Sequence, residues 1–366
     1  MQWHKEGINN MTGQTIAING QVEMINLTPE MTLLLTGIGF AGGLLSGFLG
    51  TGGAFIMTPA MMSLGIPGIM AVAANITHKF GKAIIGAKKH SELGNVDKKL
   101  GLLMFIALFA GVQAAVSINK SILLKLGLAA SNLYISLMFI LVLTGVTLVM
   151  LRDLMGRRNV NCGQKDTGGK IKSRLGKINL PPLIHFPVAG VRASLWAVFA
   201  VGLATGYLAG TIGVGGFIGI PAMIYLLGIN IRVAAGTEMF LAIFSGAQGA
   251  FLYALNGYVD LRIPLLLYIG SLVGVIMGAV VTKIVKSSQI QAVMTSIVAM
   301  VAISRAWTAP QYMAELGYLP VSAGYLNTFK LIGNLFLFGS GAVGCGLILW
   351  WMFRAFREKG RLAAGR

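Results

Sequence analysis

Charged residues are scarce in this sequence: 11 acidic and 29 basic residues make up 11% of its 366 positions. A soluble domain carries about 25% charged residues, so an ordinary soluble protein is excluded. There are only two cysteines, Cys162 in a basic stretch and Cys345 in an apolar one, which excludes a disulfide framework. The four histidines are widely separated, and no nucleophile has a matching base near it in the sequence. We therefore expect no enzyme, no catalytic residue, no cofactor and no metal site.

Apolar residues, in contrast, account for 55% of the chain, and its mean hydropathy is +0.77. A helix that crosses a membrane needs about 20 mainly apolar residues. Nine apolar runs are predicted to cross: 31–50, 67–87, 99–118, 131–151, 192–212, 231–254, 263–284, 289–304 and 325–353. Two more, 54–64 and 217–227, are too short for a comfortable span and are predicted to be half-spanning helices. The sequence thus predicts an all-α polytopic membrane protein.

The membrane part of the chain shows the pattern of a duplication. Six glycines recur at a constant offset of 163 positions, namely Gly39, Gly43, Gly47, Gly50, Gly52 and Gly53, which match Gly202, Gly206, Gly210, Gly213, Gly215 and Gly216. A shared Phe-x-x-x-Pro follows at 55–59 and, after a one-residue deletion, at 217–221. A shared Gly-x-Val-Asp turn then ends at Asp97 and Asp260. Glycine-rich composition alone does not produce three shared motifs in the same order.

The expected organisation follows from these runs and motifs. We predict a first membrane repeat over 31–155 and a second over 191–305. The remaining parts are a polar N-terminal tail (1–30), a basic cytoplasmic loop (156–190), an extra loop with a C-terminal membrane helix (306–353), and a basic cytoplasmic tail (354–366).

The orientation is predicted from the basic loops. Lys and Arg accumulate on the cytoplasmic side of membrane proteins, so the net charge of +18 is interpreted as topogenic and not as a nucleic-acid surface. With the 156–190 loop inside, the N-terminus lies outside and the C-terminus inside. Each repeat then has an odd number of crossings, and the two repeats are inverted. Inverted repeats with matching interrupted segments are typical of transporters whose site lies near the middle of the bilayer.

Two glycine interruptions are the best candidates for that site. Neither Gly50-Thr51-Gly52-Gly53 nor Gly213-Val214-Gly215-Gly216 favours helix, and an apolar half-helix follows each one. The start of a half-helix has unpaired N–H groups and the positive end of the helix dipole, which suits an anion. The alternative is a tight hairpin between two spans. The glycines spaced four apart before each interruption, Gly39 to Gly47 and Gly202 to Gly210, are expected to pack helices closely.

Polar residues in the spans complete the candidate site. The 67–87 run contains Asn75, Thr77, His78, Lys79 and Lys82, and an intramembrane cation must pair, face the interior or reach the interface. In the second repeat Glu238, beside Thr237, replaces Asn75, and no cation is repeated. Glu238 either pairs with a buried Lys or takes up a proton during coupling. His78 is either a proton carrier or a polar packing residue. The predicted anion-binding residues are Gly50, Thr51, Gly52, Gly53, Asn75, Thr77, Lys79, Lys82, Gly213, Gly215, Gly216 and Thr237.

The doubled Gly-x-Gly-Gly motif, with its Phe-x-x-x-Pro and the two Gly-x-Val-Asp turns, resembles the TauE/SafE family of sulfite exporters, also called the toluene sulfonate uptake permease family. The resemblance covers roughly 31–155 and 190–305. It implies a duplicated integral membrane protein that transports sulfite, sulfate, sulfoacetate or another organosulfur anion in either direction.

We therefore expect a secondary transporter for a small sulfur oxyanion or an organosulfonate, working by alternating access in the bacterial cytoplasmic membrane. No nucleotide-binding motif is present, so a proton, a sodium ion or the membrane potential is expected to drive it. The alternative function is a passive anion channel.

Overall fold

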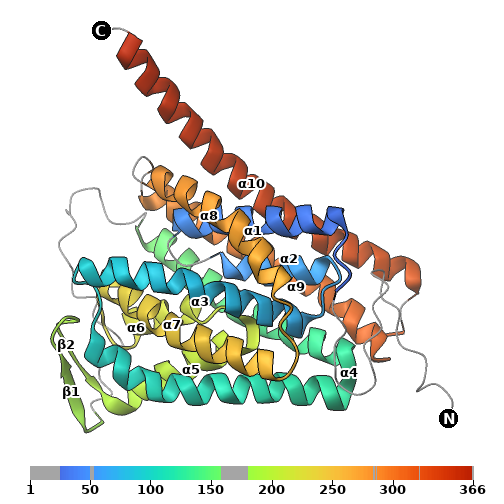
Figure 1. Cartoon of the computed structure of the whole chain (residues 1–366), viewed down its shortest axis with the longest axis horizontal. Coiled ribbons are helices and arrows are strands. Elements are labelled where there is room, and N and C mark those ends of the chain that lie inside the picture. Colours follow the sequence, from blue (N-terminus) through green and yellow to red (C-terminus); the bar gives the residue numbers. More distant parts are fainter. Residues whose placement is uncertain are drawn as a thin grey trace. The chain divides into compact units, whose positions relative to one another are not determined.

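The computed structural model describes residues 25–49, 53–157, 180–282, 285, 287–320 and 322–364. In these residues the chain forms ten helices and one β-hairpin (Figure 1). The elements are α1 (Pro29–Leu49), α2 (Ala54–Ser63), α3 (Gly68–Glu92), α4 (Lys98–Arg157), β1 (Leu183–Phe186), β2 (Val191–Ser194), α5 (Leu195–Ile212), α6 (Gly216–Tyr225), α7 (Ile231–Leu255), α8 (Arg262–Thr282), α9 (Ser287–Glu315) and α10 (Ala323–Ala364).

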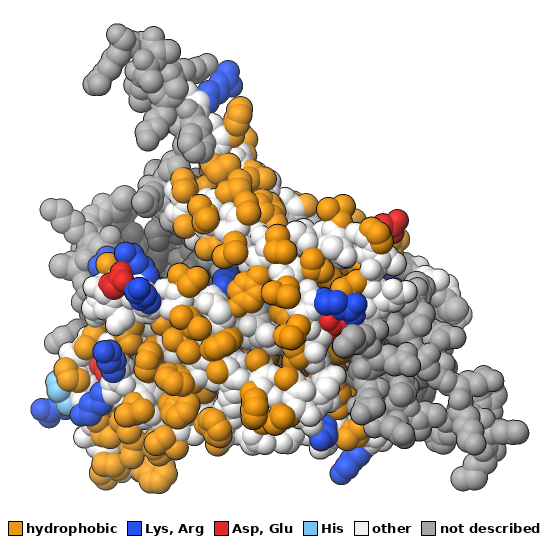
Figure 2. All heavy atoms as spheres, in the orientation of Figure 1, with side chains coloured by type: hydrophobic (Ala, Val, Ile, Leu, Met, Phe, Trp, Pro, Cys, Tyr) orange, Lys and Arg blue, Asp and Glu red, His pale blue; other side chains and the backbone are white. Residues whose placement is uncertain are grey.

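Seven of these helices, α1, α4, α5, α7, α8, α9 and α10, are long and apolar enough to cross a membrane. The predicted short helices are also confirmed, because α2 and α6 have 10 residues each. Many large apolar side chains point outward, among them Leu102 and Ile276 at 64% and 68% exposure. Hydrophobic side chains are spread over the visible face in Figure 2, with Lys and Arg at a few places. A lipid solvent explains that surface, and the protein is an all-α multi-pass membrane protein.

Three segments differ from their predicted boundaries. The runs 99–118 and 131–151 lie in two helices, as predicted, but both helices extend past their predicted ends and meet at Gly127, where φ is 85° and ψ is −177°, so that together they form α4. The residues between the runs contain no proline, and most of them favour helix. Helix α9 continues to Glu315, so residues 306–315, expected to be a loop, are helical. The antiparallel hairpin of β1 and β2, which closes through Gly190 at φ 66°, was not predicted.

The chain folds into two compact units, and each contains helices from both predicted repeats. Unit 1 comprises Met1–Asn26, Gly65–Ser131 and Cys162–Pro264, and therefore holds α3, the first part of α4, and α5 to α7. Unit 2 comprises Leu27–Leu64, Asn132–Asn161 and Leu265–Arg366, with α1, α2, the end of α4, most of α8, α9 and α10. The compact units therefore do not coincide with the two halves of the sequence.

The glycine stripes pack helices together in both units. In unit 1, β-carbons added at Gly202 and Gly206 of α5 would overlap the backbone of Met104 and Leu108 of α4. In unit 2, β-carbons at Gly39 and Gly43 of α1 would overlap the backbone of Leu267 and Ser271 of α8, which are the 163-position equivalents of Met104 and Leu108. The predicted packing role is confirmed. The same helix pair is built twice, each time from one helix of each repeat, as a duplication requires.

Helices α3 and α7 occupy equivalent positions in the two repeats and lie side by side in unit 1 (Figure 1). Ile76, early in α3, contacts Gly249, late in α7, while Gly86, late in α3, contacts Met239, early in α7. The two helices are therefore antiparallel. Each contact is also the 163-position copy of the other. Equivalent helices that run in opposite directions are what an inverted duplication predicts.

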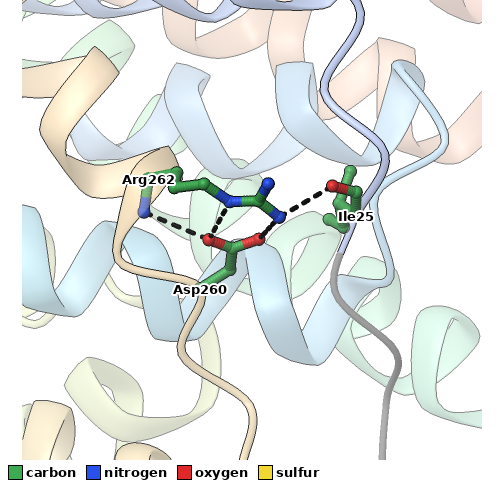
Figure 3. Close-up of polar contacts among 3 residues, drawn as sticks. All are labelled: Ile25, Asp260 and Arg262. Atoms are coloured by element: carbon green, nitrogen blue, oxygen red, sulfur yellow. Dashed lines mark hydrogen bonds and ion pairs between the residues drawn. The ribbon is translucent and has the colours of Figure 1, made fainter.

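The two Gly-x-Val-Asp turns start the following helices, as their positions predict. The Asp97 carboxylate accepts from the amide of Leu100 at 3.0 Å in the first turn of α4. The Asp260 carboxylate accepts from the amide of Arg262 at 3.1 Å, at the start of α8. Asp260 also forms an ion pair with the Arg262 guanidinium at 2.7 Å, and that guanidinium donates to the carbonyl of Ile25 (Figure 3). The second turn therefore also anchors the chain ahead of α1.

Candidate functional site

The second glycine interruption breaks the helical chain inside unit 1. Helix α5 ends where Gly213 adopts the left-handed conformation, with φ 78°. Helix α6 begins two residues later with Gly215 as its N-cap, and no side chain caps it. In the first turn of α6 the amides of Phe217 and Ile218 donate to the carbonyls of Val214 and Gly215 at 3.3 and 3.2 Å, and this turn carries the positive end of the helix dipole. A buried helix start of this kind attracts negative charge.

Asn75 of α3 lies against this interruption. A β-carbon at Gly213 would be 3.1 Å from the amide nitrogen of Asn75, whose side chain is fully buried. Lys79 is one helical turn further along α3, so both side chains project from the same face of the helix. The structure therefore brings Asn75 to the glycines between α5 and α6, with Lys79 on the same face of α3.

Glu238 of α7 lies against the first turn of α6. A β-carbon at Gly216 would be 3.1 Å from Oε1 of Glu238, and a β-carbon at Gly219 would overlap Oε2. Glu238 is only 4% exposed. A side chain at Gly219 would force the carboxylate to move, and one at Gly216 would be tight against it, so the two glycines make room for the carboxylate beside α6. An acidic side chain at this place is favoured by the dipole of α6.

Lys79 and Glu238 form a buried ion pair that links α3 to α7. The Nζ atom of Lys79 is 3.7 Å from Oε1 of Glu238, and the two side chains are 18% and 5% exposed. Within the described ranges, neither Nζ of Lys79 nor Oε2 of Glu238 has a hydrogen-bond partner. The pairing of Glu238 with a buried lysine, one of the two roles predicted for it, is thus present in the structure.

Thr205 of α5 is a further polar residue of this group, and the sequence did not single it out. Its methyl carbon would lie 3.0 Å from a β-carbon at Gly219, next to the Glu238 carboxylate. Its hydroxyl is buried and has no hydrogen-bond partner among the described residues. Thr205 directly precedes Gly206 of the glycine stripe, and that stripe was interpreted only as a helix-packing surface. A threonine on the buried face of an apolar helix is the signal that identifies it.

Four other predicted residues have different surroundings. The Thr77 hydroxyl donates to the carbonyl of Ala73 in its own helix at 2.7 Å. The Thr237 hydroxyl accepts from the amide of Asp97 at 3.1 Å, so it supports the turn before α4. His78 is 2% exposed and interacts electrostatically with Lys82, which is half-buried on α3. Their predicted roles in binding and coupling stay predictions.

The first interruption has different surroundings at the residue that can be described. Gly50, Thr51 and Gly52 lie outside the described residues. Gly53 is the N-cap of α2 in unit 2, and a β-carbon there would overlap the backbone of Gly42. This corner is packed against main chain, whereas the second interruption faces Asn75 and Glu238. An anion site shared by both interruptions stays a prediction.

A buried arginine in unit 2 was also missed. Arg305 of α9 is 1% exposed, and its guanidinium donates to the hydroxyls of Ser63 at 3.1 Å and Ser304 at 3.3 Å. In the described part of unit 2, no carboxylate oxygen lies within 4.0 Å of it. The predicted apolar run stopped at residue 304, which treated Arg305 as the end of a span. The apolar residues after Arg305 were the available signal that the helix continues past it.

Comparison with known proteins gives consistent matches. The family described as sulfite exporter TauE/SafE matches residues 35–305. The probable membrane transporter protein YdhB of Bacillus subtilis is 26% identical over 259 residues, which cover 69% of this chain and 91% of that protein. The probable membrane transporter proteins YjnA and YunE of the same organism are 24% and 22% identical, over 74% and 72% of this chain and 96% and 92% of their own lengths. No solved structure matches.

Proposed function

We propose that this chain, which belongs to the sulfite exporter TauE/SafE family, is a secondary transporter that moves a small sulfur-containing anion across the membrane by alternating access. That it is a multi-pass membrane transporter protein follows from the family and from the seven apolar helices long enough to span a bilayer. The family's description names sulfite, and sulfate and organosulfonates are the related anions that the motif resemblance implies. Alternating access is supported by the antiparallel contact of equivalent helices.

The observation that carries the proposal is the position of Lys79 in unit 1. Its ammonium group approaches the Glu238 carboxylate, which lies against the first turn of α6. The cation and the positive end of the α6 dipole therefore both lie near the same negative charge. A charge inside a membrane protein is costly and usually marks a functional site. The proposed anion site consists of Asn75, Lys79, Gly213, Gly215 and Gly216.

The proposal also includes orientation and coupling. The basic segments support an N-terminus outside and a C-terminus inside the bacterial cytoplasmic membrane. A proton or a sodium ion is the proposed coupling ion, and Glu238 and His78 are the buried titratable residues near the site that suit a proton. The transport direction depends on which gradient the cell maintains.

Flux into proteoliposomes tests the proposal. We expect saturable uptake of sulfite, sulfate or sulfoacetate that changes when a pH gradient is imposed. Lys79→Gln should reduce uptake at least tenfold, because the site loses its cation. Lys89→Gln is the matched control, since Lys89 is a 70% exposed lysine of the same helix, and it should transport normally. If none of these anions moves, the substrate assignment is wrong. Uptake that does not saturate and shows no counterflow exchange would indicate the channel.

A further inference from the structure

We propose that the Glu238 carboxylate is a built-in anion that occupies the substrate position at the first turn of α6 and gives up that position when it takes a proton. This inference rests on the proposed anion transport and adds its coupling step and a preference for monovalent anions. The carboxylate and the transported anion alternate at Lys79, so that one proton accompanies each anion.

The first support is the position of the carboxylate. Both of its oxygens lie against the glycines of the first turn of α6, Oε1 at Gly216 and Oε2 at Gly219. Oε2 is buried and accepts no hydrogen bond from the described residues, although it lies beside the first turn of α6, where the helix dipole favours negative charge. The place predicted for the substrate in unit 1 is therefore filled by a side chain.

The second support is the loose geometry of the ion pair. Charge-assisted N–H to O contacts are about 2.7–2.9 Å long, whereas Nζ of Lys79 is 3.7 Å from Oε1 of Glu238. Nζ itself donates to no described group. A buried pair contributes to stability only when its remaining hydrogen-bonding capacity is satisfied. These two groups are close enough to neutralise each other. Their contact is too long for a stabilising ion pair to be the reason for their burial.

Charge balance gives the coupling and the substrate class. With Glu238 ionised, the pair with Lys79 is neutral, and an added anion would leave a net negative charge in a buried site. When Glu238 takes a proton, Lys79 keeps one positive charge, which a single monovalent anion balances. A sulfonate or hydrogensulfite meets this requirement, and a dianion such as sulfate does not. The proton is taken from the side where the anion enters and is released when the pair forms again.

The other groups around Glu238 leave Lys79 as its charged partner. The neighbouring residues on α5 and α6 are Thr205, Gly216 and Gly219, which do not titrate. On α3 the titratable residues within one turn of Lys79 are His78 and Lys82, and Lys88, Lys89, His90 and Glu92 follow in the last turns of the helix. Asp97, whose amide donates to the neighbouring Thr237, accepts hydrogen bonds from Leu100 and Ala189 with its carboxylate.

Anion binding to the purified protein, measured by equilibrium dialysis over a pH series, tests the inference. Methanesulfonate and nitrate are suitable monovalent probes because their own charge does not change near neutrality, and sulfate is the divalent comparison. In the wild type, affinity for the monovalent probe should fall about tenfold for each pH unit above the range where Glu238 ionises. Glu238→Gln should bind that probe tightly at every pH. Glu92→Gln is the matched control, because it removes the carboxylate of the exposed Lys89–Glu92 pair of α3, and it should behave as the wild type.

A second measurement is proton uptake during binding in weakly buffered solution. The wild type should take up about one proton per monovalent anion at pH values where Glu238 is ionised, and Glu238→Gln should take up none. Elution as one symmetric peak in size-exclusion chromatography checks that the variant is folded. If Glu238→Gln does not fold, the proton count of the wild type alone decides, and a count near zero overturns the inference.

The outcomes separate the two proposals. If nitrate binds with a pH dependence that Glu238→Gln removes, and no sulfur anion binds, the inference holds and the sulfur substrate is wrong. If methanesulfonate binds with the same pH dependence in both proteins, or if sulfate binds more tightly than methanesulfonate, the inference is wrong and the sulfur-anion assignment stands. Both are overturned if none of these anions binds at any pH.

Discussion

The Nζ atom of Lys79 on α3 lies 3.7 Å from Oε1 of Glu238 on α7, and neither charge has a copy in the other repeat. The position equivalent to Lys79 is Ala242, and the one equivalent to Glu238 is Asn75. The frame that holds α3 against α7 is duplicated, whereas the ion pair within it is not. The charged pair is therefore a specialisation of this site and not a requirement of the duplicated fold.

Removing only the lysine should be worse for stability than removing both charges. In Lys79→Met the Glu238 carboxylate stays buried without its cation, which should lower the free energy of unfolding by about 3 kcal/mol. The loss should shrink as the pH is lowered, because a proton then neutralises the carboxylate. Thermal unfolding in detergent measures both effects.

The double variant Lys79→Met/Glu238→Gln is the control for that experiment. It should recover most of the lost stability, because no buried charge remains, and it should still fail to transport. Equal losses in the single and double variants would show that the lysine contributes through packing alone.

The glycine stripe gives a prediction about packing. Gly206→Ala places a β-carbon into the backbone of Leu108, so α5 and α4 must separate, at a cost of about 2 kcal/mol. Gly37→Ala is the matched control, because no other atom lies within 4 Å of its added β-carbon. Thermal unfolding should show a clear drop for Gly206→Ala only. Equal behaviour of the two variants would contradict close packing at the stripe.

Two glycines of α4 should respond to alanine with opposite signs. Gly127 has φ 85° and ψ −177°, a region that is almost restricted to glycine and costs other residues about 1–3 kcal/mol, so Gly127→Ala should lower the unfolding temperature. Gly145 lies in regular helix with open space around it, so Gly145→Ala should raise stability by up to about 1 kcal/mol. If Gly127→Ala is also neutral or stabilising, the interruption of α4 does not depend on the backbone conformation of Gly127.

Arg305 allows charge and packing to be separated. Arg305→Ala should destabilise the protein by about 3 kcal/mol, because it empties the space of a side chain that is 1% exposed. Arg305→Met fills most of that space and removes a buried charge, so it should stay within about 1 kcal/mol of the wild type or exceed it. If Arg305→Met is as unstable as Arg305→Ala, the hydrogen bonds to Ser63 and Ser304 dominate instead.

Much of the fold could be predicted because its signals are local. The length of an apolar run shows whether it can span a membrane, and this criterion predicted the spans and the short helices α2 and α6. Glycine patterns likewise predicted the break at Gly213 and the close approach at Gly206, since both follow from the missing side chain. One boundary failed because Arg305 was taken as the end of a span, whereas it is buried within a continuing helix. The two helices of α4 extend past their predicted ends and meet at Gly127.

The candidate site needed the structure. Sequence reasoning proposed Lys79, Asn75 and Glu238 separately and left open whether Glu238 meets a lysine, because 159 positions separate it from Lys79. Thr205 lies next to the glycine stripe and was not singled out. Which of these side chains meet depends on how α3, α5, α6 and α7 pack in unit 1, and no local pattern encodes that packing.

The sequence by itself determined that this chain lies in a membrane, that it repeats a glycine frame at 163 positions, and that its helices break at glycine. Hydrophobicity and backbone freedom are properties of single residues and short runs, so they can be read directly. Only the tertiary structure decided that the repeats interleave in two units and that a carboxylate lies against the start of α6. Those outcomes depend on the packing of helices distant in the chain, where one added β-carbon is enough to prevent a contact.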